Sequence, residues 1–85
     1  MDIAVELSLY PLDADYIPPI QDFIDRLNRE PGLRIVTNHL STQVFGDYDR
    51  IFGLLVRELR PTFEATGKAV FVMKVIGPYT PPAAA

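Results

Sequence analysis

The chain has 85 residues and a net charge of −3, and it is 48% apolar and 22% charged. This composition fits one small folded domain and is too hydrophobic for a disordered chain. The negative charge argues against nucleic acid as a partner, and the lack of cysteine excludes disulfides, thiolate metal sites and cysteine nucleophiles. The first residues show neither a basic leader nor an unbroken apolar run, so we expect a cytoplasmic protein without membrane insertion.

The first half of the chain predicts a strand, a helix and a hairpin. Apolar and polar residues alternate over 2–10, as in a strand. Pro18 and Pro19 suit the first turn of a helix, whose apolar stripe begins at Ile17 and which should end near Glu30. Strands at 33–38 and 40–46 flank a tight turn around His39, which predicts an antiparallel hairpin.

The second half predicts a helix and a strand. Asp47 can cap the free amides at the helix start, and Gly67 can end it. Its predicted apolar stripe comprises Phe52, Leu55, Val56, Leu59 and Phe63. The stripe continues past Pro61, which predicts a kink or a late break, and Arg57, Glu58 and Arg60 should form a solvated face. Residues 68–76 form the last strand, and we divide the chain into a domain at 1–77 and a Pro/Ala-rich tail at 78–85.

This order of elements predicts the fold class. It corresponds to an α+β, ferredoxin-like βαββαβ sandwich, with a four-stranded antiparallel sheet of order 4-1-3-2 and both helices on one face. The uniformly apolar strand positions, together with Leu40 and Thr42, should face the helices. The other face is then open.

The predicted open face mixes polar and apolar side chains. Strand alternation assigns to it Glu6, Ser8, Tyr10, Val36, Asn38, Ser41, Gln43, Phe45, Val70, Val72 and Lys74. Because an apolar patch of this kind is seldom left to water, we expect a second copy of the chain to cover it. Each polar group buried there without a partner would cost about 1–3 kcal/mol.

Two interpretations of these polar groups remain open. In the first, Glu6, Ser8, Ser41 and Gln43 line a pocket for a flat heteroaromatic ligand, stacked on an aromatic ring. In the second, Glu6 and Lys74 form an interface ion pair and the hydroxyls bond only to the backbone. The chain would then be a structural or regulatory oligomerisation module without a small ligand.

No catalytic or metal-binding pattern is present. His39 is the single histidine and lies in a predicted turn, without further ligands at metal-site spacing. Ser8 and Ser41 lack a general base, and Asp47 and Asp49 fit helix capping better than acid–base chemistry. We therefore expect neither an enzyme nor a cofactor.

Several segments resemble the YkoF-type thiamine and hydroxymethylpyrimidine-binding family. They are ELSLYPL at 6–12, DYIPPIQDFIDRLN at 15–28, PGLRIVTN at 31–38, STQVFGDYD at 41–49 and FVMK at 71–74. The combination of SLYPL with TNxxSTQVFG is the specific part. The resemblance implies a ferredoxin-like fold, binding of thiamine or its pyrimidine moiety without catalysis, and a link in some members to an uptake system for that precursor. The namesake of the family carries two such units, so a single-unit chain would pair them as a homo-oligomer, either dimer or tetramer.

The resemblance also implies a set of site residues. The motif positions are Ser8, Asn38, Ser41, Thr42, Gln43, Phe45 and Gly46. Glu6 joins them on chemical grounds, because a buried carboxylate can pair with a protonated aminopyrimidine. Alternation directs Thr42 toward the helices although the motif includes it, and a bulge at Leu40 or Ser41 would reverse the two faces.

Overall fold

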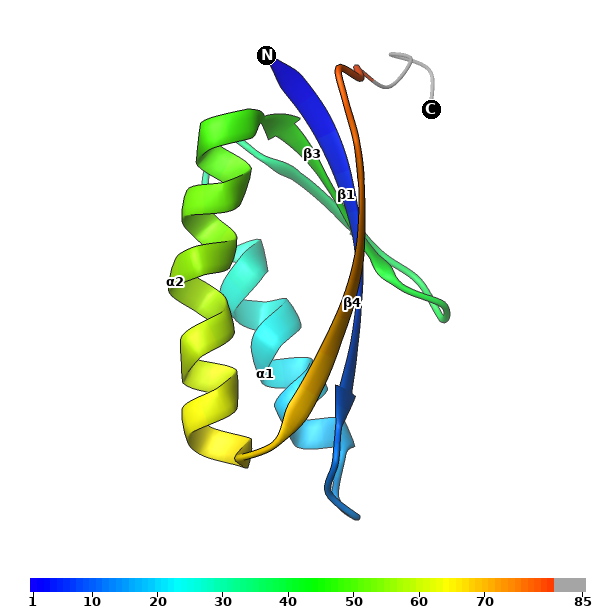
Figure 1. Cartoon of the computed structure of the whole chain (residues 1–85), viewed down its shortest axis with the longest axis vertical. Helices are drawn as coiled ribbons and strands as arrows, with labels where there is room; N and C mark the ends of the chain where they lie inside the picture. Colours follow the sequence, from blue (N-terminus) through cyan, green and yellow to red (C-terminus); the bar gives the residue numbers. More distant parts are fainter. Residues whose placement is uncertain (81–85) are drawn as a thin grey trace.

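The computed structural model describes residues 1–80, which form four strands and two helices; the last five residues of the predicted tail, 81–85, lie outside them. The elements are β1 (Asp2–Pro11), α1 (Ile17–Asn28), β2 (Arg34–Thr37), β3 (Thr42–Asp47), α2 (Tyr48–Thr66) and β4 (Ala69–Ile76). All strand pairs are antiparallel, in the order β2-β3-β1-β4. Both helices lie on one side of the sheet (Figure 1). The predicted ferredoxin-like βαββαβ sandwich is confirmed.

The helix ends follow from local chemistry. Pro18 and Pro19 occupy the first turn of α1, where their missing amide hydrogens leave no bond unmade. At the start of α2 the Asp47 carboxylate accepts hydrogen bonds from the amides of Asp49 and Arg50, at 3.1 and 3.2 Å. Gly67 ends α2 with φ +74°, a conformation that glycine adopts without strain. Pro61 lies inside α2, which continues to Thr66.

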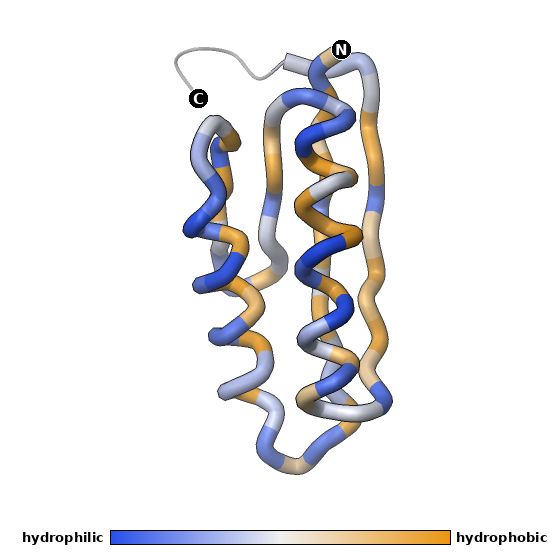
Figure 2. Tube along the Cα trace, turned by 90° about the vertical axis from the view of Figure 1, so that its left-hand side faces the viewer, coloured by the Kyte–Doolittle hydropathy of each residue, from blue (hydrophilic) through white to orange (hydrophobic). Residues whose placement is uncertain are grey.

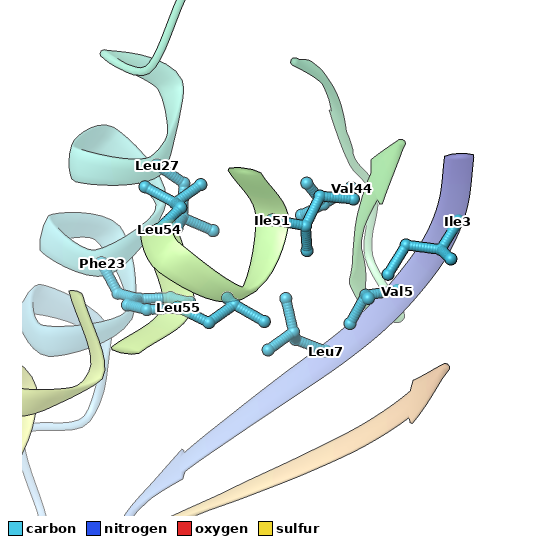
Figure 3. Close-up of a cluster of buried hydrophobic side chains, with 9 residues drawn as sticks. All are labelled: Ile3, Val5, Leu7, Phe23, Leu27, Val44, Ile51, Leu54 and Leu55. Carbon is cyan, nitrogen blue, oxygen red and sulfur yellow. The ribbon is translucent and has the colours of Figure 1, made fainter. Parts of the chain in front are cut away.

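A single core fills the space between the helices and the sheet (Figure 3). The sheet contributes Ile3, Val5, Leu7 and Val44, and the helices contribute Phe23, Leu27, Ile51, Leu54 and Leu55. The four sheet residues alternate with residues of the opposite face along β1 and β3, as predicted. Burying a side chain of this size stabilises the fold by about 1.5–3 kcal/mol.

The predicted apolar stripe of α2 is confirmed at Leu55, Phe52 and Leu59, which belong to the core or pack against it, and is wrong at Val56 and Phe63. Val56 is 77% exposed and Phe63 is 42% exposed, whereas Leu54 is 1% exposed. The helix carries apolar residues on two neighbouring flanks, and the buried flank is the one through Ile51, Leu54 and Leu55. The predicted stripe shares Leu55 with the buried flank and continues onto the second flank, where Phe63 contacts Phe71 of β4. Periodicity alone could not decide which of the two faces the sheet.

Three further predictions are corrected by exposure. Leu40, expected to face the helices, is 88% exposed because the hairpin turn includes it and β3 begins only at Thr42. Ile17 is 64% exposed at the first residue of α1. Glu58, assigned to a solvated face, has a side chain only 14% exposed.

Glu58 belongs to a polar cluster that joins the two helices. Arg26 of α1 donates to the Glu58 carboxylate at 2.9 Å and to the Thr62 hydroxyl at 2.7 Å, and it also bonds Asp22 at 2.9 Å. Burial alone would raise the pKa of Glu58, but hydrogen bonds from Arg57 and Arg26 outweigh it and lower that pKa. The cluster therefore holds a charged Glu58 between the helices.

No helix within residues 1–80 has the length and apolar character needed to cross a membrane.

Candidate functional site

The hairpin turn is built around one side chain. The Asn38 Oδ1 atom accepts hydrogen bonds from the amides of Leu40 and Ser41, at 2.9 and 3.1 Å. The backbone N–H of Asn38 in turn donates to the backbone carbonyl of Ser41 at 3.0 Å. This arrangement satisfies the turn internally, as asparagine often does. The turn projects beyond the sheet on the side away from the helices (Figure 1).

A polar network lies on the open face beside this turn. The Ser41 hydroxyl donates to Glu6 Oε2 at 2.9 Å and accepts from Gln43 Nε2 at 2.7 Å. Lys74 approaches Glu6 Oε1 at 3.7 Å from the neighbouring strand β4. Glu6 and Lys74 are opposite residues of one sheet, so their ion pair forms within a single chain. The network joins three strands.

A cavity of about 390 Å³ opens where β3 ends beside β1. Its walls come from β1, from α1 and from the hairpin turn. Tyr16 and Phe23 contribute aromatic rings, and Ser8, Asn38 and Ser41 contribute polar groups. Ligand pockets commonly have volumes of about 300–1,000 Å³ with apolar walls and a few polar groups. The cavity lies within this range.

The cavity exists because β1 is longer than its partner. The pairing of β1 with β3 ends at Leu7 and Thr42, whereas the pairing with β4 continues to Pro11. Successive residues of a strand direct their amide groups to opposite sides. The carbonyl of Met1 accepts a bond from Tyr48, beyond the end of β3, and that of Asp2 from Tyr79, beyond the end of β4. Odd-numbered residues of β1 therefore direct their backbone N–H and C=O groups toward β3.

Leu9 is the odd-numbered residue of β1 that comes next after the end of this pairing. Its backbone N–H and C=O groups point to the β3 side of β1, but the pairing of β1 with β3 ends before Leu9, so β3 supplies no residue opposite it. Leu9 also lines the cavity. The backbone N–H donor and C=O acceptor of Leu9 are thus directed into the cavity, which aromatic side chains also line.

The structure divides the predicted site residues between two hollows. Ser8, Asn38, Ser41 and Thr42 line the cavity. Glu6, Gln43 and Phe45 line a second hollow of about 250 Å³ on the open face. The hydrogen bonds of Ser41 connect the two groups.

Thr42 and Gly46 are closely packed against other residues of the chain. Thr42 is buried at 6% exposure, and its hydroxyl lies 3.1 Å from that of Thr37. It therefore faces the helices, as alternation predicted, and still contributes to the cavity wall. Gly46 lies against Leu33, whose Cδ2 would be 2.4 Å from an added Cβ atom, so a larger residue would clash there.

The C-terminal end of the described chain also reaches the open face. The Tyr79 ring packs on Phe45 with centroids 6.3 Å apart, and the Tyr79 amide donates to the Asp2 carbonyl at 2.7 Å. Phe45 is partly buried, and the Arg34 guanidinium also lies over its ring at 5.7 Å from the centroid. A second aromatic ring is therefore present beside the Glu6 network.

Sequence reasoning missed the contribution of α1 and of the Leu9 backbone. It treated the helix as a cover for the core, although Ile20 and Ile24 of α1 line the cavity, as does Tyr16 just before the helix. The available signal was strand length, because a first strand of about nine residues cannot be fully paired by a third strand of seven. Within residues 1–80, no group of three or more potential metal ligands of the His, Cys, Asp and Glu types is present.

Comparison with known families places the chain among its relatives. The sequence model of the YKOF-related family matches residues 2–74. The chain belongs to the YKOF-related family. The predicted resemblance is thereby confirmed over nearly the whole sheet and both helices of this YKOF-related chain. No curated protein sequence matches it.

Solved structures share the fold of this YKOF-related chain at low sequence identity. A Streptococcus pneumoniae protein aligns with a TM-score of 0.85 at 20% identity, covering 93% of this chain and 89% of that one. A proposed thiamine biosynthesis/salvage protein from Thermotoga maritima aligns with a TM-score of 0.80 at 16% identity, covering 88% and 82%. A Methanocaldococcus jannascii protein aligns with a TM-score of 0.79 at 19% identity, covering 95% and 84%. These likenesses establish the fold.

Proposed function

We propose that this protein binds thiamine or its hydroxymethylpyrimidine moiety without changing it chemically. Membership in the YKOF-related family supports a thiamine-related role, as does the likeness to the Thermotoga maritima protein. The observation that carries the proposal is the unpaired edge of β1 inside a cavity of suitable size. Besides this ligand, we propose neither a cofactor nor a metal.

The proposed binding mode uses the chemistry of an aminopyrimidine ring. Such a ring carries an amino donor next to a nitrogen acceptor, which matches the amide N–H and C=O of Leu9. The rings of Tyr16 and Phe23 line the same cavity and offer flat apolar contact. The hydroxyls of Ser8 and Ser41 lie at the cavity wall and can bond the hydroxymethyl group.

The open face completes the proposed site. Glu6, Gln43 and Phe45 adjoin the cavity through Ser41. In the proposed arrangement they contact the part of thiamine that extends beyond the pyrimidine ring, and the Glu6 carboxylate favours its positive charge. A second copy of the chain covers this face, which shields the ligand from water. In the cell the protein would hold the precursor in the cytoplasm, in association with an uptake system.

A thermal-shift measurement tests the proposal. Thiamine and hydroxymethylpyrimidine at millimolar concentration should each raise the melting temperature, because a ligand at 100 times its Kd adds about 2.7 kcal/mol of stability. The free thiazole moiety of thiamine should have little effect, since it lacks the aminopyrimidine edge. If neither pyrimidine compound shifts the melting temperature, the proposal is wrong.

A pair of asparagine variants locates the site. Asn38→Ala removes both hydrogen bonds that shape the turn beside the cavity, and we expect roughly a tenfold loss of affinity, equivalent to about 1.4 kcal/mol. Asn28→Ala is the matched control, because this asparagine is exposed on α1, donates to the Ile24 carbonyl at 2.9 Å and does not line the cavity. Equal affinities of the two variants would place the ligand elsewhere.

A second function has one observation in its favour. Tyr10, Val70 and Val72 are 55%, 44% and 50% exposed on the open face, which suits an oligomerisation module that binds no small ligand. The same measurement separates the two functions. An oligomer that no pyrimidine compound stabilises would support this module instead.

A further inference from the structure

The Ser41 hydroxyl in the cavity wall has already donated its hydrogen. It lies 2.9 Å from Glu6 Oε2 and 2.7 Å from Gln43 Nε2. Because a carboxylate can only accept a hydrogen bond, the hydroxyl hydrogen belongs to the bond with Glu6. The Gln43 amide must then donate, since a second acceptor would find no hydrogen at this oxygen. What Ser41 still offers a ligand is a lone pair, which is an acceptor.

The Ser8 hydroxyl in the same wall is directed in the same way. It donates to the backbone carbonyl of Leu40 at 3.4 Å, so its oxygen also keeps lone pairs for a ligand. The Oδ1 atom of Asn38 is occupied by the amides of the turn. A ligand group that contacts the two serine oxygens must therefore bring its own hydrogen or a positive charge.

The rest of the cavity wall offers little to balance a negative charge. Within the described part of the chain, the residues that line the cavity include neither lysine nor arginine, and His39 lies in the exposed turn. Figure 2 shows hydrophobic and hydrophilic residues alternating along α1, the helix at the left. The cavity receives Ile20 and Ile24 from this helix, whereas Arg26 bonds Glu58 of α2. An anion in the cavity would therefore be removed from water without a cation beside it.

A negative charge lies directly behind the serine wall. Glu6 bonds Ser41 through Oε2, while Lys74 approaches the other oxygen, Oε1, at 3.7 Å. The carboxylate thus stands between the Ser41 hydroxyl and the ammonium group, and the Lys74 side chain is 83% exposed to water. An anion in contact with Ser41 would be closer to the carboxylate than to the ammonium group, so the net effect is repulsion.

We propose that the site selects its pyrimidine ligand by the charge of the substituent next to the ring, accepting a free hydroxyl or a positive group and rejecting a phosphate ester. This inference rests on the proposed function and adds the chemical state of the ligand. Hydroxymethylpyrimidine carries a hydroxyl on its exocyclic carbon, thiamine carries the positive thiazolium ring on that same carbon, and the phosphate ester carries a negative group there. The protein therefore holds the pyrimidine before phosphorylation and not after it.

Isothermal titration calorimetry with hydroxymethylpyrimidine, its phosphate ester and thiamine tests the inference. We expect the ester to bind at least about 100-fold more weakly than hydroxymethylpyrimidine, as for a charge buried without a partner. Thiamine is the control for size, because its thiazolium substituent is larger than a phosphate group and should still be accepted.

The outcomes separate this inference from the proposed function. An ester that binds within about threefold of hydroxymethylpyrimidine would overturn the inference and leave the proposed function standing. Failure of both hydroxymethylpyrimidine and thiamine to bind would instead show that the proposed function is wrong, and the inference would fall with it.

A charge-removing variant tests the role assigned to Glu6. Glu6→Gln keeps an acceptor for the Ser41 hydroxyl and removes the negative charge, so the ester should bind about tenfold more tightly than it does to the wild type. Loss of folding cannot produce such a gain. Glu64→Gln is the matched control, because this exposed residue of α2 lines neither hollow. An ester affinity that is the same in both variants would overturn the proposal.

Discussion

Arg26 offers the sharpest test of what holds the two helices together. The replacement Arg26→Met keeps most of the apolar stem of the side chain and removes the guanidinium group. The wild-type side chain is 13% exposed and bonds both Glu58 and Thr62 across the helix interface. We expect this variant to be less stable by about 3 kcal/mol.

This magnitude follows from the fate of each partner. Arg26 Nη1 donates to both the carboxylate and the backbone carbonyl of Glu58, and Nη2 donates to Thr62. These bonds are partly buried and involve a charged donor, so each of the two partner residues contributes about 1.5 kcal/mol, at the low end of the usual range. Asp22 is 63% exposed and adds little. Glu58 keeps a 2.9 Å hydrogen bond from Arg57, so the loss stays below that of a fully orphaned buried charge.

Urea denaturation followed by circular dichroism measures the change in the free energy of unfolding. In a domain of this size, about 3 kcal/mol also corresponds to a fall in melting temperature of about 12–24 °C. Asp22→Asn is the matched control, because it removes only the exposed partner of Arg26. The reasoning would be refuted if Arg26→Met cost no more stability than Asp22→Asn.

Two other predictions concern α2. Leu54→Ala should lower the free energy of unfolding by about 2–5 kcal/mol, because the side chain is 1% exposed. Val56→Ala, at 77% exposure, should change it by no more than about 0.5 kcal/mol in the monomer. Chemical denaturation of dilute protein compares the two variants, and equal losses would contradict the buried flank described above. The pKa of Glu58 is lowered from its ordinary value of 4.5, since hydrogen bonds from Arg57 and Arg26 outweigh the effect of burial. Its contribution is therefore fully present above about pH 4.5 and is lost as the pH falls through the lowered pKa. Unfolding of Glu58→Gln between pH 6 and 2 should show a weaker acid dependence than wild type, and an identical pH profile would contradict the assignment.

The order of elements and of strands could be predicted because each depends on local patterns. Alternation in 2–10 and 68–76, proline at the start of α1 and the Asp47 cap all act over a few residues. Right-handed crossovers then leave one sheet order for this sequence of elements. The facing of Ser41 and Gln43 followed as well, since β3 contains no bulge relative to β1.

The cavity and the phase of α2 depend on contacts that no local pattern contains. The Asn38 side chain ends the hairpin strands at Thr37 and Thr42 by binding turn amides, whereas alternation alone would have continued the strand to Leu40. This early end leaves Leu9 without a partner strand. In α2, both flanks are apolar, and the packing of the helix on the sheet selects the one that contains Leu54.

The mismatch in length between β1 and β3 has a consequence for how the site can change over time. The donor and acceptor at position 9 belong to the main chain, so every residue except proline would present the acceptor and the donor alike. The side chains around them are then free to vary in size and polarity and to fit a different ring. A binding site of this kind can acquire a new ligand preference without losing its hydrogen-bonding frame.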